Sequence, residues 1–248
     1  MTIHKQATER SGPGSERCAR QRSACGRTID RSCDNATMTE RPQSRAEELA
    51  NSLSHGGALL AAVAVTPFLI AASVPAGAGH IVGTAAFCAT MMLLYFTSTL
   101  YHALPHGRAK NVFMRLDHIA IYFFIAGSYT PFALGALMGP WGWTLFGLVW
   151  TMALVGTILK STNMLKHPWL STGLYVAMGW IVLIAAVPLV RHVPMPGVAL
   201  LVAGGVAYTG GVVFYLLDSR LRYAHTVWHG FVVAGTTCHF LAVLSYSA

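Results

Sequence analysis

Seven apolar segments, each long enough to cross a bilayer, follow one another from Ser54 to the end of this 248-residue chain. A membrane-spanning helix needs about 20 mostly apolar residues. Short turn-forming stretches such as VPAGAG and MGPWG separate the segments, so each helix should run antiparallel to the one before it. The chain is therefore expected to fold as an all-α polytopic membrane protein, a bundle of seven transmembrane helices. The predicted spans are about 54–74, 80–104, 117–138, 141–159, 168–190, 195–217 and 225–247.

The scarcity of charge supports a lipid environment. Charged residues make up 10% of the chain, against about 25% in ordinary soluble proteins. So few charges cannot cover the surface of a soluble globule, and the composition excludes a disordered chain, a disulfide-rich secreted module and a nucleic-acid binder. We expect a multi-pass protein of the cell membrane. Pro131 and Pro188 fall inside predicted spans and should kink them.

The basic residues predict how the bundle is oriented. If the N-terminus is cytoplasmic, 16 of the 17 Lys and Arg residues lie on the cytoplasmic side, and only Arg191 lies outside. Lys and Arg are enriched in cytoplasmic loops. The C-terminus, after a seventh helix, is then extracytoplasmic.

Residues 1–46 form a polar tail without the apolar core that a secretory signal peptide needs. The spacing of Cys18, Cys25 and Cys33 matches no zinc module, so the tail is expected to be unstructured, with free thiols. An ordinary N-terminus begins at Met38, which suggests that residues 1–37 are an upstream extension without a function of their own. The membrane domain is assigned to residues 47–248.

Polar residues gather at one predicted depth, the cytoplasmic end of the helices. Ionisable side chains in membrane helices are costly and usually face the bundle interior. One end of each of four segments carries them. They are Glu47, Asn51 and His55 before the first helix, His102 at the end of the second, Asp117 at the start of the third, and His225 and His229 at the start of the seventh.

Three of these residues suggest a metal site. His225 and His229 are four positions apart, which places both imidazoles on one helix face, about 6 Å apart. Such a pair alone is more often structural. His102 adds a third imidazole at the same depth, and three histidines with an open fourth position describe a catalytic zinc site. Imidazole also suits Cu, Ni and Fe.

Asp117 and Ser98 are the candidate catalytic residues. Asp117 could simply pair with Arg115 or cap its helix, or it could orient a metal-bound water and take its proton. Ser98 lies one turn before His102 and could bond a backbone carbonyl or donate to a polarised substrate oxygen.

The remaining polar positions have plainer interpretations. Glu47, Asn51 and His55 recur every four residues, so they share a helix face, which could be an ordinary solvated helix start. His239 lies about 21 Å deeper than His225 and cannot share its ion. We interpret it as a buried histidine that is paired across the bundle or lines a cavity.

The motifs EELANSLSH, STLYH, RLDH and HTVWH, taken in order, resemble those of the hemolysin III proteins, which belong with the progestin and adiponectin receptor (PAQR) family. The resemblance extends from about residue 46 to the end. It implies a seven-helix bundle with a cytoplasmic N-terminus and a zinc ion held by His102, His225 and His229. It also implies that Asp117 reaches the metal through water, and that Ser98 lies beside the site.

The resemblance leaves the activity open among three functions. This family is grouped with alkaline ceramidases in a superfamily proposed to be membrane hydrolases, which implies a zinc-dependent hydrolase of lipid amides or esters, with a membrane lipid as substrate. Bacterial members carry a hemolysin name, which suggests a pore-forming cytolysin or channel and an inner-membrane location. The third alternative is a membrane receptor in which zinc is structural.

Overall fold

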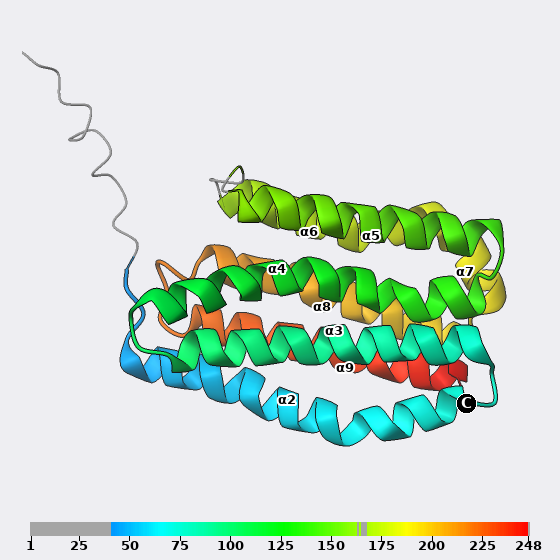
Figure 1. Ribbon diagram of the computed structural model, residues 1–248, viewed down its shortest axis with the longest axis horizontal. Helices are drawn as coiled ribbons and strands as arrows, with labels where there is room; N and C mark the ends of the chain where they lie inside the picture. The colour runs from blue at the N-terminus through cyan, green and yellow to red at the C-terminus, as the bar shows by residue number, and fades with distance from the viewer. Residues whose placement is uncertain (1–40, 163, 165–167, 248) are drawn as a thin grey trace, which may run out of the picture. The chain divides into compact units, whose positions relative to one another are not determined.

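The computed structural model describes residues 41–162, 164 and 168–247. Cys18, Cys25, Cys33 and the proposed upstream extension lie outside these residues. The described chain is helical and contains no strand. Labelled as in Figure 1, its α-helices are α2 Arg45–Ser73, α3 Ala78–Ala103, α4 Arg108–Pro131, α5 Pro140–Ser161, α6 Pro168–Trp180, α7 Ala186–His192, α8 Met195–Leu216 and α9 Ala224–Ser247.

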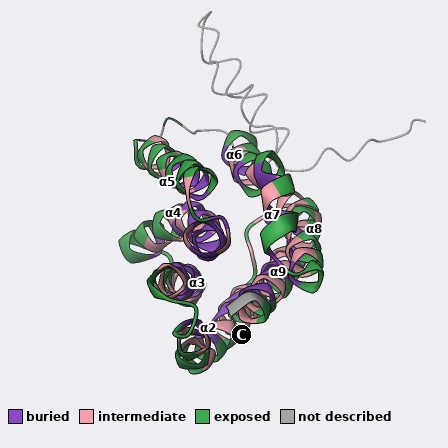
Figure 2. Ribbon diagram, turned by 90° about the vertical axis from the view of Figure 1, so that its right-hand side faces the viewer, coloured by how far each residue is buried: buried purple, intermediate pink, exposed green. Residues whose placement is uncertain are grey.

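These helices make seven apolar spans, which confirms the predicted seven-helix bundle. A short π-helix, η1 (Phe132–Ala136), extends α4, and a short 3₁₀ segment, η2 (Ile181–Ala185), joins α6 to α7, so that each group forms one span. The spans form a ring in the order α2, α3, α4, α5, α6–α7, α8, α9, and α9 closes it against α2 (Figure 2).

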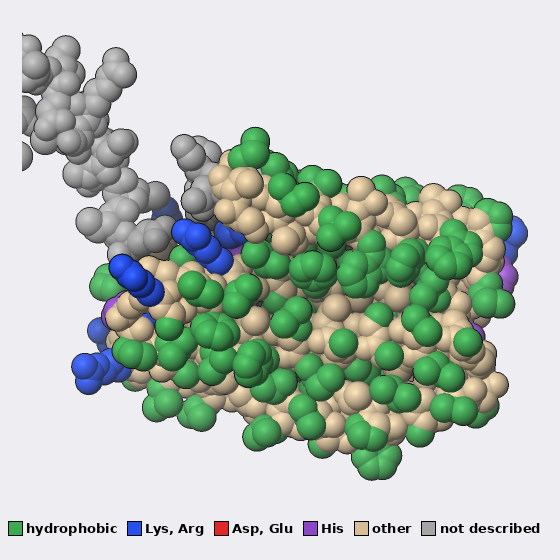
Figure 3. Space-filling model, viewed as in Figure 1, with side chains coloured by type: hydrophobic (Ala, Val, Ile, Leu, Met, Phe, Trp, Pro, Cys, Tyr) green, Lys and Arg blue, Asp and Glu red, His purple; other side chains and the backbone are tan. Residues whose placement is uncertain are grey.

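The outer face of the bundle is apolar, as lipid contact requires. Large hydrophobic side chains are exposed along it; Phe68 is 75% exposed and Leu60 73%. Hydrophobic side chains cover the lateral face in Figure 3, whereas Lys and Arg gather mainly at the end where α2 and α4 begin. The chain is a multi-pass membrane protein.

Two helices begin earlier than predicted, and both extensions are polar. The first span begins at Arg45 instead of about residue 54, and the third begins at Arg108 instead of about residue 117. Hydropathy placed these turns outside the spans because they are polar, although some of their polar side chains are buried against protein. Glu47 and Asn51, for example, are 2% and 0% exposed.

The predicted proline positions coincide with breaks in helical geometry. Pro131 ends α4 where the π-helix begins, and Pro188 lies in α7, just after the 3₁₀ segment. Pro67, inside α2, is a third internal proline that the sequence analysis did not single out.

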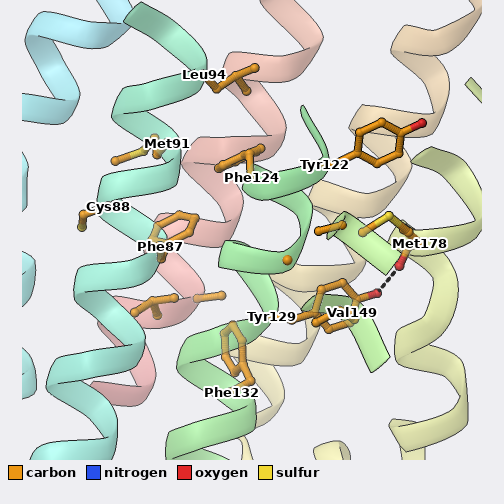
Figure 4. Packing of buried hydrophobic residues seen from close by; sticks show 14 of the residues in the cluster. Phe87, Cys88, Met91, Leu94, Tyr122, Phe124, Tyr129, Phe132, Val149 and Met178 are labelled. Carbon is orange, nitrogen blue, oxygen red and sulfur yellow. Dashed lines mark hydrogen bonds between the residues drawn. The ribbon is translucent and has the colours of Figure 1, made fainter. Parts of the chain in front are cut away.

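Tyr129 satisfies the backbone at the second of these breaks. Its hydroxyl shares one proton between the carbonyl oxygens of Met178 at 3.0 Å, the bond drawn in Figure 4, and Gly179 at 2.6 Å. It also accepts from the Val182 amide at 3.0 Å. Unpaired backbone groups are costly in a bilayer, so this hydroxyl makes the irregular turn tolerable there.

The apolar core lies between α3 and α4 and continues toward α5 and α6. Figure 4 shows Phe87, Met91 and Leu94 of α3 beside Phe124 of α4. The two helices approach closely at Gly83, where an added Cβ would lie 2.6 Å from Pro131 Cα. This packing fixes α3, which carries Ser98 and His102, against α4, which carries Asp117.

Candidate metal centre

Three histidines converge at the end of the bundle where α2 and α9 begin and α3 ends. Each of His102, His225 and His229 offers a ring nitrogen, and these three atoms lie within 4.8 Å of one another. The ring centroids are 4.8 to 5.1 Å apart. His102 and His229 are buried, and His225 is half-buried. The group could hold one metal ion.

The Nδ1 atom of each histidine already has a protein partner. His102 Nδ1 lies 2.7 Å from Glu48 Oε2, and His225 Nδ1 lies 3.0 Å from Asp218 Oδ2. His229 Nδ1 lies 3.2 Å from the Asn51 carbonyl oxygen and 3.0 Å from Ser54 Oγ. Because the Ser54 hydroxyl donates its proton to that same carbonyl, His229 Nδ1 must carry the hydrogen.

This arrangement leaves the other ring nitrogens for a metal. An Nδ1–H that donates to an oxygen places the lone pair on Nε2, which is the form that binds metal ions. Nε2 of His102 and Nε2 of His225 are buried and have no hydrogen-bond partner among the described residues. A bound cation would satisfy both atoms, so the donor set fits a metal ion.

Glu48 is itself held by a second helix. Lys110 Nζ of α4 lies 2.9 Å from Glu48 Oε1 and donates to the Tyr101 carbonyl at 2.9 Å. The carboxylate therefore joins α2, α3 and α4 behind His102, and Lys110, at 7% exposed, offsets its charge.

The buried stripe of α2 docks against α9. Asn51 Oδ1 accepts from Thr226 Oγ1 at 2.5 Å, and the His55 ring stacks on His229 with centroids 3.6 Å apart. Glu47, Asn51 and His55 are all at most 3% exposed. Their interpretation as a solvated helix start is therefore wrong, because the stripe faces the ligand-bearing helix.

Ser98 lies beside His55, which stacks on His229, and Asp117 interacts with Ser98. Ser98 Oγ is 2.7 Å from His55 Nδ1 and also faces the Asp117 carboxyl. Asp117 is not a helix cap, because α4 begins at Arg108. Its side-chain partner is Ser98 of α3, one turn from the ligand His102.

His239 is not part of this group. Its ring packs edge-on against Tyr208 of α8, with centroids 5.3 Å apart, and its buried Nδ1 has no hydrogen-bond partner among the described residues. It is paired across the α8–α9 contact, which is one of the two roles that the sequence left open.

Comparison with known proteins assigns the chain to a family. Residues 43–240 match the family model described as "Haemolysin-III related", a range that includes every residue of the metal centre. The chain belongs to the haemolysin-III-related family. It is 40% identical to Hemolysin-3 of Bacillus cereus over 210 residues, which cover 84% of this chain and 95% of that protein. It is also 40% identical to a Hemolysin-3 homolog of Bacillus subtilis (strain 168) over 201 residues, which cover 81% and 94%.

More distant similarity reaches mammalian proteins. Monocyte to macrophage differentiation factor of Homo sapiens is 30% identical over 158 residues, which cover 62% of this chain and 65% of that protein. This relative supports membership of the wider PAQR family. No solved structure matches the chain.

In this haemolysin-III-related chain, sequence reasoning missed the residues that surround the three histidines. Glu48, Ser54, Lys110 and Asp218 were not predicted as site residues. The scarcity of acids was a usable signal. Only four acidic residues follow residue 46, and each contacts the metal centre or the helix ends that form it.

Proposed function

We propose that this protein is a zinc-dependent hydrolase of lipid amides or esters. The observation that carries the proposal is the convergence of three imidazoles whose Nδ1 atoms are all engaged by protein oxygens. A structural site closes all four positions of a tetrahedral zinc ion with protein ligands, whereas three histidines leave one position open. Zinc is preferred to other metals because neutral imidazole ligands and this ligand count suit it.

His102, His225 and His229 would hold the ion. Zinc bound in this way polarises a carbonyl oxygen and lowers the pKa of a coordinated water to about 7. The protein's own contribution is to hold three neutral rings in one orientation, through Glu48, Asp218 and the Asn51 carbonyl.

Asp117 is proposed to accept the proton of the attacking water at a carboxylate oxygen and to return it to the leaving group. Ser98 is proposed to connect it to the site, because Ser98 interacts with the Asp117 carboxyl and its hydroxyl lies 2.7 Å from His55 Nδ1. The two residues lie on neighbouring helices, and Ser98 is one helical turn from His102.

The substrate class is inferred from where the site lies. The histidines are at the end of the bundle where most of the Lys and Arg residues gather, and we propose that this end faces the cytoplasmic leaflet of a bacterial inner membrane. A lipid whose scissile amide or ester lies just below its head group would present that bond at the same depth.

The test combines metal analysis with hydrolysis assays on purified protein. His225→Ala should lose most of its zinc, because two imidazoles make a weak site, whereas His239→Ala on the same helix should keep it. Asp117→Asn should retain zinc yet lose hydrolysis, because an amide cannot take a proton at neutral pH. Ser98→Ala should give a milder loss, of at most about 2.7–4 kcal/mol in transition-state stabilisation.

Two outcomes would favour the alternatives. A zinc-loaded protein that hydrolyses no lipid amide or ester, and whose Asp117→Asn variant changes only in stability, would indicate a structural clamp. The relatives named Hemolysin-3 suggest cytolysis instead, and release of a trapped dye from lipid vesicles, unaffected by His225→Ala, would support that function.

A further inference from the structure

The two oxygen atoms of the Glu47 carboxylate bind different parts of the chain. Oε2 accepts from the Ser44 amide at 2.9 Å and the Ser44 hydroxyl at 2.8 Å, which completes the capping box that starts α2. Oε1 accepts from the backbone amide of Tyr223 at 2.9 Å, 176 residues away. Glu47 is 2% exposed, so one buried carboxylate joins the start of α2 to the α8–α9 loop, residues 217–223.

Arg41 reinforces the same junction. Its guanidinium lies 2.6 Å from Glu47 Oε1 and 2.8 Å from Oε2, and it also donates to the Leu221 carbonyl at 3.3 Å. The hydrogen bond to Glu47 raises the pKa of Arg41 above its ordinary value, so the guanidinium stays charged. The loop is thereby held at two successive points, Leu221 and Tyr223.

The held residue has an unusual backbone. Tyr223 has a φ of 59°, and it is the only non-glycine residue with positive φ among those that the structure describes. A bulky residue in this region is strained, and such strain persists only where the surroundings enforce it. Tyr223 as a whole is 45% exposed, so we attribute the enforcement to the backbone bond to Glu47 rather than to packing of the side chain.

This strained residue directly precedes the ligand helix. α9 begins at Ala224, and His225 is two positions after Tyr223. On the next turns of the two helices, Asn51 bonds Thr226 and His55 stacks on His229. Residue numbers rise together along both helices, so α2 and α9 run parallel, and the first contact of this series is the Glu47–Tyr223 bond. The left-handed turn sets where α9 starts, and with it the position of His225.

We propose that Glu47 is a positioning residue of the metal centre, which acts through the α8–α9 loop by holding Tyr223 in its left-handed conformation and so placing His225. This inference rests on the proposed metal site. Glu47 touches none of the three histidines, and its effect on them is transmitted by the backbone of residues 223–225.

Zinc affinity of the full-length protein in detergent, measured by competition with a chelating dye, provides the first test. Glu47→Ala should weaken zinc binding by about tenfold or more, in the range seen when supporting residues of metal sites are removed. Glu47→Gln should lose less zinc affinity than Glu47→Ala, because its amide oxygen can still accept from the Tyr223 amide, whereas its NH2 group meets two donors, the Ser44 amide and the Arg41 guanidinium. Ser44→Ala is the control for the start of α2, since it removes the two hydrogen bonds of the Ser44 hydroxyl but leaves the Glu47 carboxylate bonded to Arg41 and to the Tyr223 amide.

Relief of the backbone strain separates positioning from a general structural role. Glycine adopts positive φ at no steric cost, so Tyr223→Gly alone should leave zinc affinity unchanged. In the Glu47→Ala background, Tyr223→Gly should recover most of the lost affinity. If Glu47→Ala has no effect, or if Tyr223→Gly fails to restore binding, the proposal is overturned.

A second measurement on the metal-free protein does not depend on zinc. Arg220 and Arg222 are exposed in the loop, so trypsin cleavage after them reports on how firmly the loop is held. Cleavage after Arg108 serves as the internal reference. Relative to it, cleavage after Arg220 and Arg222 should be several-fold faster in Glu47→Ala than in the wild type, and unchanged in Ser44→Ala. If the wild-type protein binds no zinc but the two variants differ in cleavage as expected, the proposed function is refuted, and the role of Glu47 in holding the α8–α9 loop is supported. If the wild-type protein binds zinc but Glu47→Ala leaves cleavage unchanged, only the role of Glu47 is refuted.

Discussion

Nδ1 of each histidine in the candidate metal centre contacts an oxygen atom, which fixes the orientation of the ring. Two of these oxygen atoms belong to carboxylates. Glu48 holds His102 and Asp218 holds His225, whereas a neutral carbonyl holds His229. A carboxylate behind a ligating imidazole both orients the ring and makes it a stronger donor.

The first prediction concerns these carboxylates. Glu48→Gln and Asp218→Asn should each weaken zinc binding by about tenfold, because the amides keep the shape but remove the charge that strengthens the donor. Chelator competition on the purified variants measures this loss. Asp117→Asn is the control, since it removes one carboxylate that does not contact a ligand ring and should bind zinc as the wild type does. Unaltered affinity in both test variants would contradict the role assigned to the two acids.

At the residue scale, sequence reasoning identified histidines that the structure brings together but not what surrounds them. The spacing of His225 and His229 places them on one helix face because that relation is local. The partners of Asn51 and His55 lie on a helix about 175 residues later, and no local pattern encodes such a contact. Asp218 was passed over because a single acid near a helix end resembles an ordinary solvated residue.

At the scale of helices, the breaks in α4 and α6–α7 show how a membrane bundle tolerates irregular backbone. Near the centre of the α6–α7 span, the carbonyl groups of Met178 and Gly179 and the amide of Val182 all form hydrogen bonds with the hydroxyl of Tyr129. The prolines predicted that breaks would occur, but they could not predict that Tyr129, on another helix, would satisfy the backbone at one of them.

The second prediction tests this phenol. Tyr129→Phe should lower the free energy of unfolding by about 1–3 kcal/mol, because it leaves buried backbone groups unpaired. Tyr122→Phe is the matched control. It removes only a hydroxyl–hydroxyl contact of 3.3 Å with Ser171 and should cost about 0.5–1.5 kcal/mol at most. Unfolding by SDS in mixed micelles compares the two. If both variants lose the same free energy of unfolding, the three hydrogen bonds of Tyr129 to the backbone contribute no more to stability than the single contact of Tyr122.

Helix boundaries were the weakest part of the sequence-based fold. The apolar centres of all seven spans were predicted, because lipid requires them to be apolar. The polar first turns of α2 and α4 were left outside the predicted spans, although Glu47, Asn51 and His55 were expected to share a helix face. Hydropathy registers the polarity of a side chain and not the direction in which it points. Those turns supply Glu47, Glu48 and Lys110.

For the whole molecule, the charge pattern makes a prediction about orientation. Arg108 and Lys110 begin α4, and Arg220 and Arg222 lie in the α8–α9 loop, at the end of the bundle that holds the histidines. Arg191 lies near the end of α7, at the other end. A reporter fused after Ala248 should therefore be active in its extracytoplasmic form, as alkaline phosphatase is, and a fluorescent protein fused there should stay dark. The same reporters fused after Ser161, the last residue of α5, should give the reverse pattern. A cytoplasmic signal from the fusion after Ala248 would place the metal centre at the opposite leaflet.

The closing of the ring by α2 and α9 has a consequence for biogenesis. Ser54 and His229, which touch across this closure, are separated by 175 residues of synthesis. At about 5–20 residues per second, the ribosome needs roughly 9–35 s to make the intervening chain. During that interval α2 is in the membrane with Glu47, Asn51 and His55 lacking the helix that will bury them. The nascent protein must therefore shelter a polar stripe from lipid until its last helix arrives, and the three histidines can come together only after translation is nearly complete.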